Sequence, residues 1–414
     1  MTQLKLIGKN SQKAKYELSK LKSNEKNNIL NKVADELVKN TNTIIKENKL
    51  DIIKAKQSGV KESLIDRLLL TEDRIISMAE GLNKISRLMD PVGEVLYMKE
   101  MGNGLKIGKK RVPMGVIGII YESRPNVTID AFGLCFKTNN VVILRGGSDA
   151  INSNKILVEI VQNTLEKYNL PKEIVQIIKD TDRKTALEMM KMNEYLDLLI
   201  PRGGAGLIKS VVENSTVPVI ETGTGNCHVY IDSYADLDMA VKIADNAKTQ
   251  RTGVCNACEK LVVHKDIADA FLPKILSVFK DKTVEIRGDS IVKSIDSSVI
   301  SVKEDDWSTE YLDMIVGVKV VNNIDEAISH INQYGTGHSE AIITENYTNS
   351  QKFLDMVDAA AVYVNASTRF TDGEEFGFGA EIGISTQKLH ARGPMGLEEL
   401  TSNKYIIYGS GQIR

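Results

Sequence analysis

Two cysteines, Cys255 and Cys258, stand close together in the segment RTGVCNACEK. Their C-x-x-C spacing is compatible with a redox dithiol, with half of a zinc site, or with one nucleophilic thiol beside an unreactive neighbour. A structural zinc site needs four ligands, and the nearest candidates, Cys227, His228 and His264, form no second close-spaced pair. A thioredoxin-type motif would lie at the start of a helix near the beginning of the chain, whereas this segment lies in the second half of the chain. On spacing alone, two buried and inert cysteines remain the simplest alternative.

The residues around Cys255 favour a reactive thiol over that alternative. Thr252 and Gly253 precede it, and Asn256 and Ala257 follow it, so the thiol is expected in a break between a helix and a strand. Catalytic groups commonly lie on loops of this kind. A thiol there can be activated by backbone N–H groups or by a helix terminus.

The elements that must position this thiol are indicated by hydrophobic periodicity. Residues 1 to about 90 are predicted to be helical, because apolar residues recur three and four positions apart, as at Ile29, Val33 and Leu37. Residues 94–112 are predicted to form a β-hairpin around a Gly-Asn-Gly turn. The chain therefore begins with helices and a hairpin, and the thiol must lie on elements that follow them.

From Pro113 onward, short apolar strands alternate with helices. The first series is predicted to have strands at 114–121, 141–145, 174–178, 195–200 and 217–221, and helices at 127–138, 149–168, 182–192 and 204–213. Ser148 is the predicted N-cap of the helix at 149–168. This alternation predicts βαβ units and a buried parallel sheet, and five such strands favour a doubly wound nucleotide-binding domain.

A second α/β series follows and contains the Cys255 segment. Its predicted strands are 228–232, 261–264, 316–321, 340–344 and 360–365, and its predicted helices are 236–248, 266–278, 324–333 and 348–357. The tail, NKYIIYGSGQIR, is predicted to be a terminal strand. Cys255 is thus predicted to lie immediately before a strand of a second sheet.

Composition excludes several classes of function. A chain of 414 residues is long enough for two or more domains. Lys and Arg number 53 against 55 Asp and Glu, so nucleic acid is not expected as a partner. The sequence has no apolar run of about 18 residues for a membrane span and no apolar core of a secretory signal. Four cysteines do not make a disulfide framework at this length, and the cytoplasm is the expected compartment.

The sequence resembles the aldehyde dehydrogenase superfamily over essentially its whole length, and most closely the branch of acyl-phosphate reductases in proline biosynthesis. The resemblance rests on an ordered set of segments: VPMGVIGIIYESRPNVTIDAFGLCFKTNNVVILRGGSDA (112–150), IPRGGAGLI (200–208), IETGTGNCHVYID (220–232), KTQRTGVCNACEKLVVH (248–264), YGTGHSEAIIT (334–344) and NASTRFTDGEEFGFGAEIGIST (365–386). A single glycine motif would be a weak signal, whereas this ordered set is specific.

The resemblance implies an α/β, aldehyde-dehydrogenase-like fold. It assigns residues 1–93 and 113–227 to a Rossmann-type NADP-binding domain and residues 228–390 to an α/β catalytic domain. Residues 94–112 and 402–414 would form a small β oligomerisation element. Unpaired strands there would be aggregation-prone edges unless another subunit covered them, so a homodimer or homotetramer is expected.

The implied reaction is the NADPH-dependent reduction of L-glutamate 5-phosphate to L-glutamate 5-semialdehyde with release of phosphate, the second step of proline biosynthesis from glutamate. Cys255 would be the nucleophile that forms a thioester, with Cys258 as a neighbour, and a functional association with glutamate 5-kinase would follow. Two alternatives remain open. One is an aldehyde dehydrogenase that forms free acids, and the other is a non-catalytic protein that uses both cysteines as a reversible dithiol.

The same resemblance suggests the other catalytic groups. The oxyanion that develops at the acyl carbon needs donors, most simply the Cys255 N–H and one side chain. Ser123 falls near the position of the superfamily's oxyanion asparagine, and Asn126 is the nearby alternative. Glu221, which lies 34 residues before Cys255, resembles the superfamily's general base. In a reductase it would deprotonate Cys255 or contact the cofactor, and a glutamate without a catalytic role is the competing interpretation.

The cofactor site is expected after the second and fourth strands of the first series. No G-x-G-x-x-G motif follows the strand at 114–121, so the usual dinucleotide fingerprint is missing. The resemblance instead indicates these positions: Arg145, Gly146, Gly147, Gly203 and Gly204. Glycines allow a close approach of the backbone to a ribose or pyrophosphate, and the following helix offers its N-terminus. Arg145 facing a 2′-phosphate would favour NADP over NAD. Seen alone, these glycines are equally typical of ordinary strand-to-helix turns.

Five further side chains are candidates for binding the cofactor or the substrate that the resemblance implies. Glu310 matches the superfamily glutamate that holds the nicotinamide ribose. A substrate with an α-amino acid group and a phosphate needs charged partners, for which Arg124, His338, Glu340 and Arg369 are candidates. A structural or surface role is as good an interpretation for each of these four. No metal site is expected.

Overall fold

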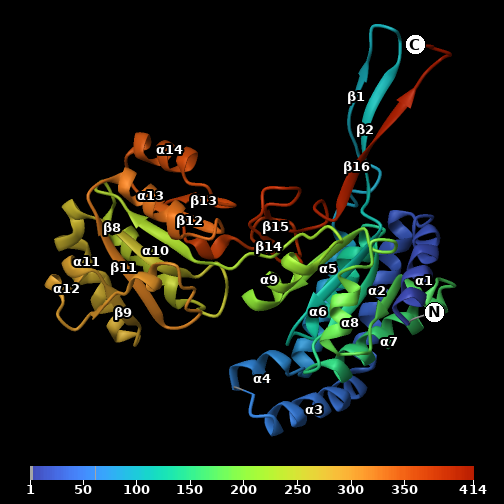
Figure 1. Cartoon of the computed structure of the whole chain (residues 1–414), viewed down its shortest axis with the longest axis horizontal. Helices are drawn as coiled ribbons and strands as arrows, with labels where there is room; N and C mark the ends of the chain where they lie inside the picture. Colours follow the sequence, from blue (N-terminus) through green and yellow to red (C-terminus); the bar gives the residue numbers. More distant parts are fainter. Residues whose placement is uncertain (1–2, 61) are drawn as a thin grey trace. The chain divides into compact units, whose positions relative to one another are not determined.

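The structure is a computed structural model that describes residues 3–60 and 62–414. The described chain forms two compact units (Figure 1). The first unit comprises Met1–Thr222, Gly377–Gly383 and Met395–Arg414, and the second comprises Gly223–Phe376 and Ile384–Pro394. The assignment of cofactor binding and catalysis to separate domains stays a prediction. No helix in the described residues is long and apolar enough to cross a membrane.

The predicted helical segment at the N-terminus is confirmed. It forms helices α1 (Gln3–Leu18), α2 (Ser23–Lys39), α3 (Thr41–Gln57), α4 (Glu62–Leu68) and α5 (Glu72–Arg87). Ile29, Val33 and Leu37 are buried on one face of α2 because their spacing matches the helical period. Helices α2 and α5 pack against each other.

The sheet of the first unit is parallel, with strand order β5-β4-β3-β6. Its strands are β3 (Val116–Tyr121), β4 (Val141–Gly146), β5 (Val175–Ile177) and β6 (Leu198–Arg202). They are connected through helices α6 (Asn126–Lys137), α7 (Ile151–Lys167) and α8 (Arg183–Met189), and α9 (Ala205–Asn214) follows β6. The order runs from β3 outward to β5 and then returns to β6 on the other side of β3. The topological switch point between β3 and β6 is where open α/β sheets bind ligands.

Two details of the first series were predicted incorrectly. The segment at 217–221 is not a full strand, because it joins the sheet only through a bridge between Leu199 and Val219. Pro218 faces β6 and has no N–H to continue the ladder. Ser148 is not the cap of α7, whose cap position is held by Ala150. The carboxylate of Asp51 instead accepts hydrogen bonds from the first backbone N–H groups of α7.

The predicted hairpin and terminal strand are present in the first unit. The hairpin consists of β1 (Val95–Glu100) and β2 (Lys106–Pro113), and β16 (Thr401–Tyr408) pairs antiparallel with β2 along its length. The resulting sheet, in the order β1-β2-β16, exposes apolar side chains that include Tyr405 and Ile407. The open edge strand β16 therefore carries exposed apolar side chains.

The second unit is built on a sheet with strand order β10-β9-β11-β8-β7-β12-β13. Its strands are β7 (Cys227–Ile231), β8 (Cys258–His264), β9 (Glu285–Gly288), β10 (Ile300–Ser301), β11 (Ile315–Val321), β12 (Ser339–Ile343) and β13 (Ala361–Val364). Its helices are α10 (Leu237–Thr249), α11 (Lys265–Asp281), α12 (Ser290–Ile295), α13 (Ile324–Tyr334) and α14 (Tyr347–Met356). A short pair, β14 (Ile384–Ser385) and β15 (Gly393–Pro394), completes the unit.

The elements β9, α12 and β10 were not predicted. Each is short, and the strand sequence EIRG is half polar, so hydrophobic periodicity gives little signal there. Strands β7 and β8, which lie next to the Cys255 loop, are central in the sheet and entirely buried. They therefore provide a rigid base for the loop that carries the thiol.

Candidate active site

Cys255 lies in the loop between α10 and β8, as predicted from its flanking residues. It is half-buried, whereas Cys135, Cys227 and Cys258 are buried. Cys258 is the first residue of β8 and belongs to the apolar core of the second unit. Burial raises the pKa of Cys258 to about 12, so its thiolate is not accessible near neutral pH. Of the C-x-x-C pair, only Cys255 has the exposure that a nucleophile needs.

The backbone of Cys255 is supported from beneath by the segment that leads into β7. A Cβ atom on Gly225 would lie 1.4 Å from the carbonyl oxygen of Cys255, so only glycine fits there. The thiol of Cys227 donates to the same oxygen at 3.1 Å. The Gly225 N–H donates to Oε1 of Glu310 at 2.6 Å. Glu310, expected to hold the nicotinamide ribose, is therefore engaged in supporting the thiol loop in this structure.

A second loop holds the other side of the Cys255 segment. The side-chain amide of Asn256 donates to the carbonyl oxygens of Thr371, at 2.9 Å, and Arg369, at 3.3 Å. The hydroxyl of Thr368 donates to the carbonyl oxygen of Asn256 at 2.7 Å. These reciprocal bonds fix the residue after Cys255 to the 3₁₀ turn at Thr368–Phe370.

Arg369 places positive charge near the thiol. Its Nε donates to Oε1 of Gln250 at 2.9 Å, which directs the guanidinium toward the end of α10. Burial lowers the pKa of Arg369, Arg251 lowers it further, and Cys255 raises it. This mutual influence means that Arg369 and Cys255 lie within electrostatic range. A nearby guanidinium favours the thiolate form of a cysteine.

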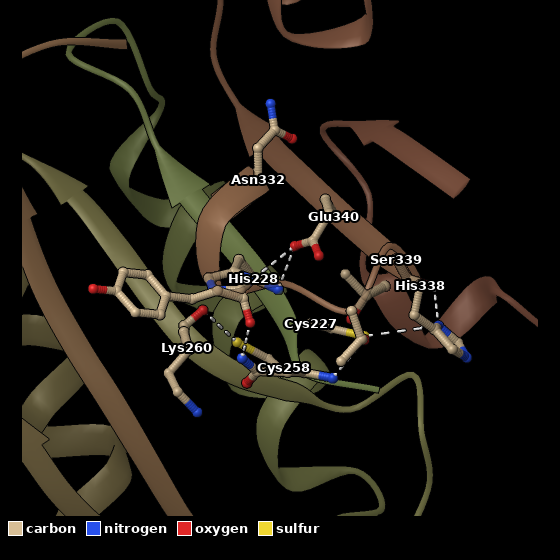
Figure 2. A network of polar contacts seen from close by, with 12 residues as sticks. Cys227, His228, Cys258, Lys260, Asn332, His338, Ser339 and Glu340 are labelled. Atoms are coloured by element: carbon tan, nitrogen blue, oxygen red, sulfur yellow. Dashed lines mark hydrogen bonds and ion pairs between the residues drawn. The ribbon is translucent and has the colours of Figure 1, made fainter. Parts of the chain in front are cut away.

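His338 and Glu340, expected as substrate ligands, lie inside the second unit (Figure 2). Glu340 accepts from the backbone N–H of His228 at 2.6 Å and lies 3.0 Å from its Nδ1. Burial raises the pKa of Glu340 and lowers that of His228 to about 3. Nδ1 of His338 lies 2.7 Å from the Ser339 hydroxyl. The burial of these side chains favours support of the sheet over direct substrate contact, and residues 3–60 and 62–414 contain no group of three or more His, Cys, Asp or Glu arranged for a metal.

In the first unit, the expected cofactor residues lie at the carboxyl ends of β4 and β6, next to Glu122. Oε2 of Glu122 accepts from the N–H of Gly204 at 3.3 Å, at the N-terminus of α9. A Cβ on Gly203 would lie 2.6 Å from the same oxygen. Sequence reasoning missed Glu122, although its position directly after the apolar run of β3 places it at the ligand-binding edge of the sheet.

The loop after β4 requires its glycines for close packing. A Cβ on Gly146 would lie 2.1 Å from Nδ2 of Asn154, and one on Gly147 would lie 2.2 Å from Oδ1 of Asp149. The Ser123 hydroxyl donates to the other carboxylate oxygen of Asp149. Ser123 has a positive φ of 46°, a left-handed conformation uncommon for serine. The loops after β3 and β4 are thus tied together at this edge.

Arg145, the candidate for the 2′-phosphate, points across the sheet edge toward the segment after β5. One guanidinium nitrogen, Nη2, donates to the carbonyl oxygens of Thr181 at 2.8 Å and Asp182 at 3.3 Å. Burial lowers the pKa of Arg145, and the negative charges of Glu122, Asp180 and Asp182 raise it. Its Nε is buried and has no hydrogen-bond partner among the described residues. The two carbonyl oxygens therefore hold the guanidinium in place at the carboxyl end of β4.

The remaining candidates of the first unit lie near its other loops. Asn126 is exposed at the start of α6, and its side-chain amide donates to Asp130 at 3.0 Å. Arg124 is half-buried just before that helix. Glu221 is half-buried near the end of the long segment of the first unit, whereas Cys255 belongs to the second. The predicted roles of Asn126, Arg124 and Glu221 stay predictions.

Comparison with known proteins gives a consistent result. The sequence matches the model of the aldehyde dehydrogenase family over residues 2–313 and 300–406. It is 61% identical to a gamma-glutamyl phosphate reductase of Clostridium botulinum and 59% identical to one of Lachnospira eligens, each over 414 residues that cover 100% of both chains. The crystal structure of a gamma-glutamyl phosphate reductase from Thermotoga maritima, 51% identical, superposes with a TM-score of 0.98 and full coverage of both chains.

Proposed function

Because this chain belongs to the aldehyde dehydrogenase family, and within it to the gamma-glutamyl phosphate reductases, we propose that it reduces L-glutamate 5-phosphate to L-glutamate 5-semialdehyde with NADPH and releases phosphate. The observation that carries this proposal is the end-to-end match, at about 60% identity, to reductases of that name. This is the second step of proline biosynthesis from glutamate. We place it in the cytoplasm, where its free cysteines would stay reduced.

The reaction proceeds through attack of the Cys255 thiolate on the acyl carbon. A C–S bond forms as the C–O bond to phosphate breaks, which gives a thioester and free phosphate. Hydride addition to the thioester carbon gives the anion of a thiohemiacetal, which collapses to the aldehyde and regenerates the thiolate. Cysteine suits both steps because its thiolate is a strong nucleophile and a good leaving group. The positive charge of Arg369 would favour the thiolate form of Cys255.

NADPH, when bound, supplies the hydride. The loops at the carboxyl ends of β4 and β6 suit a dinucleotide, because Gly146, Gly147 and Gly203 have no room for a side chain and the backbone there can approach a ligand closely. The positive charge of the Arg145 guanidinium at this edge would attract the 2′-phosphate, which is the basis for proposing NADP rather than NAD. The carboxylate of Glu122 would face ribose hydroxyls at the same edge.

Two side chains compete for the role of oxyanion donor. The hydroxyl of Ser123 already donates to Asp149, so it has no second proton to offer. The amide of Asn126 donates one hydrogen to Asp130 and keeps a second for another acceptor. Asn126 therefore fits the role better, alongside the backbone N–H of Cys255. Glu221 would deprotonate the thiol or contact the cofactor.

The proposed function predicts an absolute requirement for phosphate in the reverse direction. With glutamate semialdehyde and NADP supplied, the appearance of NADPH by absorbance should depend on inorganic phosphate, because phosphate is the group that must attack the thioester. Without phosphate, the rate should fall to background. An aldehyde dehydrogenase that forms free acids would use water and run equally well without phosphate, and that result would contradict the proposal.

We also propose that the enzyme is a homodimer or homotetramer that pairs through the sheet β1-β2-β16. Tyr405 and Ile407 on β16 are 62% and 59% exposed, and an open apolar edge strand is a liability unless a partner covers it. The double substitution Tyr405→Lys, Ile407→Lys is expected to give a folded monomer in size-exclusion chromatography with light scattering. The matched control is Tyr347→Lys on α14, which is 77% exposed and should leave the assembly unchanged. Monomers of the unmodified chain would contradict this proposal.

An association with glutamate 5-kinase is proposed on chemical grounds. Acyl phosphates hydrolyse in water, so direct passage from the enzyme that forms the substrate would limit its loss. In a coupled assay with the kinase, the semialdehyde yield should then exceed that obtained when the two enzymes are separated by a dialysis membrane. Equal yields would argue against the association.

A further inference from the structure

The strand that follows the thiol loop carries buried charges that the proposed mechanism does not use. Glu259 and Lys260, consecutive on β8, are both 0% exposed. Their side chains point to opposite faces of the sheet because successive residues of a strand alternate. Burying an ionised group is costly unless it is paired and hydrogen-bonded. The partners of these two residues therefore indicate what they contribute.

The partners of Glu259 lie on α10 and on the segment after Thr309. Its Oε2 accepts from Nζ of Lys248 at 3.0 Å, and both side chains are fully buried. Its Oε1 accepts from the backbone N–H of Leu312 at 3.1 Å. Leu312 has a φ of +53°, in the left-handed region where a leucine is strained. Glu259 thus stabilises an unusual backbone conformation just before β11.

Lys260 holds the same segment at its other end. Its Nζ donates to the carbonyl oxygen of Thr309 at 2.8 Å and lies 4.2 Å from the centre of the Tyr311 ring. A Cβ on Gly317 would come within 2.8 Å of Cδ of Lys260, so the glycine leaves room for the lysine stem. Burial lowers the pKa of Lys260 to about 8, and the carboxylate of Glu259 opposes this shift and favours the charged ammonium.

Glu310 lies between these two anchor points. Thr309 and Tyr311 contact Lys260, and Leu312 is bound by Glu259, so the backbone on both sides of Glu310 is fixed. The carboxylate of Glu310 in turn accepts the N–H of Gly225 at 2.6 Å. Gly225 packs directly against the carbonyl oxygen of Cys255. A continuous set of contacts thus connects the charges on β8 to the loop that carries the thiol.

We propose that Lys260 and Glu259 are positioning residues for the reaction. They hold residues 309–312 so that Glu310 fixes Gly225 beneath Cys255. The inference rests on the proposed function in so far as Cys255 is the nucleophile. A neutral side chain of similar length at position 260 would fill the space but could not bind the Thr309 oxygen or attract the Tyr311 ring. Glu310 would then lose its fixed position, and the Cys255 loop would lose its support.

Hydrogen exchange tests the contact itself without any substrate. In K260M and in E310A, exchange of the peptide that contains the Gly225 amide should be at least about tenfold faster than in the unmodified protein, because the acceptor of that N–H is displaced or removed. K319M is the matched control. Lys319 lies on the neighbouring strand β11, 5.3 Å from the Trp307 ring, and none of its described hydrogen bonds or ion pairs involves residues 309–312. Unchanged exchange in K260M would overturn the proposal even if the enzyme had another activity.

A double-mutant cycle tests the consequence for catalysis. K260M and E310A should each lower kcat roughly 100-fold, the loss typical of a misplaced reacting group, with a smaller change in KM for the acyl phosphate. If Lys260 acts through Glu310, the double variant should be no worse than either single variant. Multiplied losses would mean independent structural roles and would overturn the proposal. If K260M does not fold, Y311L is the substitute variant. Tyr311 is half-buried, and its replacement removes the ring that the Lys260 ammonium contacts. Y311L should show the same coupling to E310A.

Discussion

Replacement of Cys255 by alanine is expected to lower NADP-linked turnover by about 10⁴-fold or more, whereas Cys258→Ala should keep most of the activity. The size of the first effect follows from the loss of the thiol that we propose forms the thioester, since removal of a catalytic nucleophile commonly costs several orders of magnitude. Cys258 is buried at the start of β8, and burial raises its pKa to about 12. Steady-state rates of the reverse reaction, with phosphate present, would measure both variants.

The control for this experiment is the stability of each variant. Cys258 belongs to the apolar core of the second unit, and its replacement by a smaller side chain is expected to cost about 1 kcal/mol of folding free energy. Thermal unfolding would separate that cost from a loss of chemistry. Equal inactivation by both substitutions, with both proteins folded, would contradict a single nucleophile and would favour the reversible dithiol.

Gly225→Ala is expected to reduce kcat by roughly 100-fold, because the loop under the nucleophile cannot keep its position. The new Cβ would lie 1.4 Å from the Cys255 carbonyl oxygen, which is backbone and cannot rotate away. The loop must therefore shift, and the bonds from Gly225 to Glu310 and from Cys227 to Cys255 must lengthen or break. Activity and thermal unfolding of the variant would measure the effect.

The matched control is Gly81→Ala. Gly81 lies within α5, and a Cβ there would meet no described atom within 4 Å. Alanine in the middle of a helix is favoured over glycine by about 0.5–1 kcal/mol, so this variant should be equally active and slightly more stable. If Gly225→Ala kept full activity, the close approach of the Gly225 backbone to the Cys255 carbonyl oxygen would not be required for catalysis.

The course of the chain was largely predictable from the sequence. Apolar runs such as 141–145 are found as buried strands, and the helical spacing of Ile29, Val33 and Leu37 is found as a buried helix face. Local periodicity reports these features because burial on one side of an element repeats with the geometry of that element. The segment at 217–221 was predicted incorrectly because periodicity does not reveal how many ladder bonds a strand completes once a proline interrupts it.

Membership of the aldehyde dehydrogenase family and the position of Cys255 in a loop between a helix and a strand were also predictable from the sequence alone. Both predictions rest on local features of the chain. The family is indicated by short sequence segments, and the loop is indicated by the residues on either side of Cys255, so neither requires knowledge of the fold. Sequence spacing also pairs Cys255 with Cys258, because the two cysteines are close together in the chain. The thiol that contacts the Cys255 backbone is instead that of Cys227, which lies 28 residues away.

Only the tertiary structure decided which residues support the loop that carries Cys255. Glu310 reaches Gly225 across 85 residues, and Lys260 reaches Thr309 across 49. The sequence does not distinguish Glu259 and Lys260 from a pair of charged surface residues. It also does not distinguish Glu122 from any polar residue that follows a strand. Their burial and their partners depend on which strands the sheet places side by side. That order is set by packing between distant segments, and no local spacing encodes it.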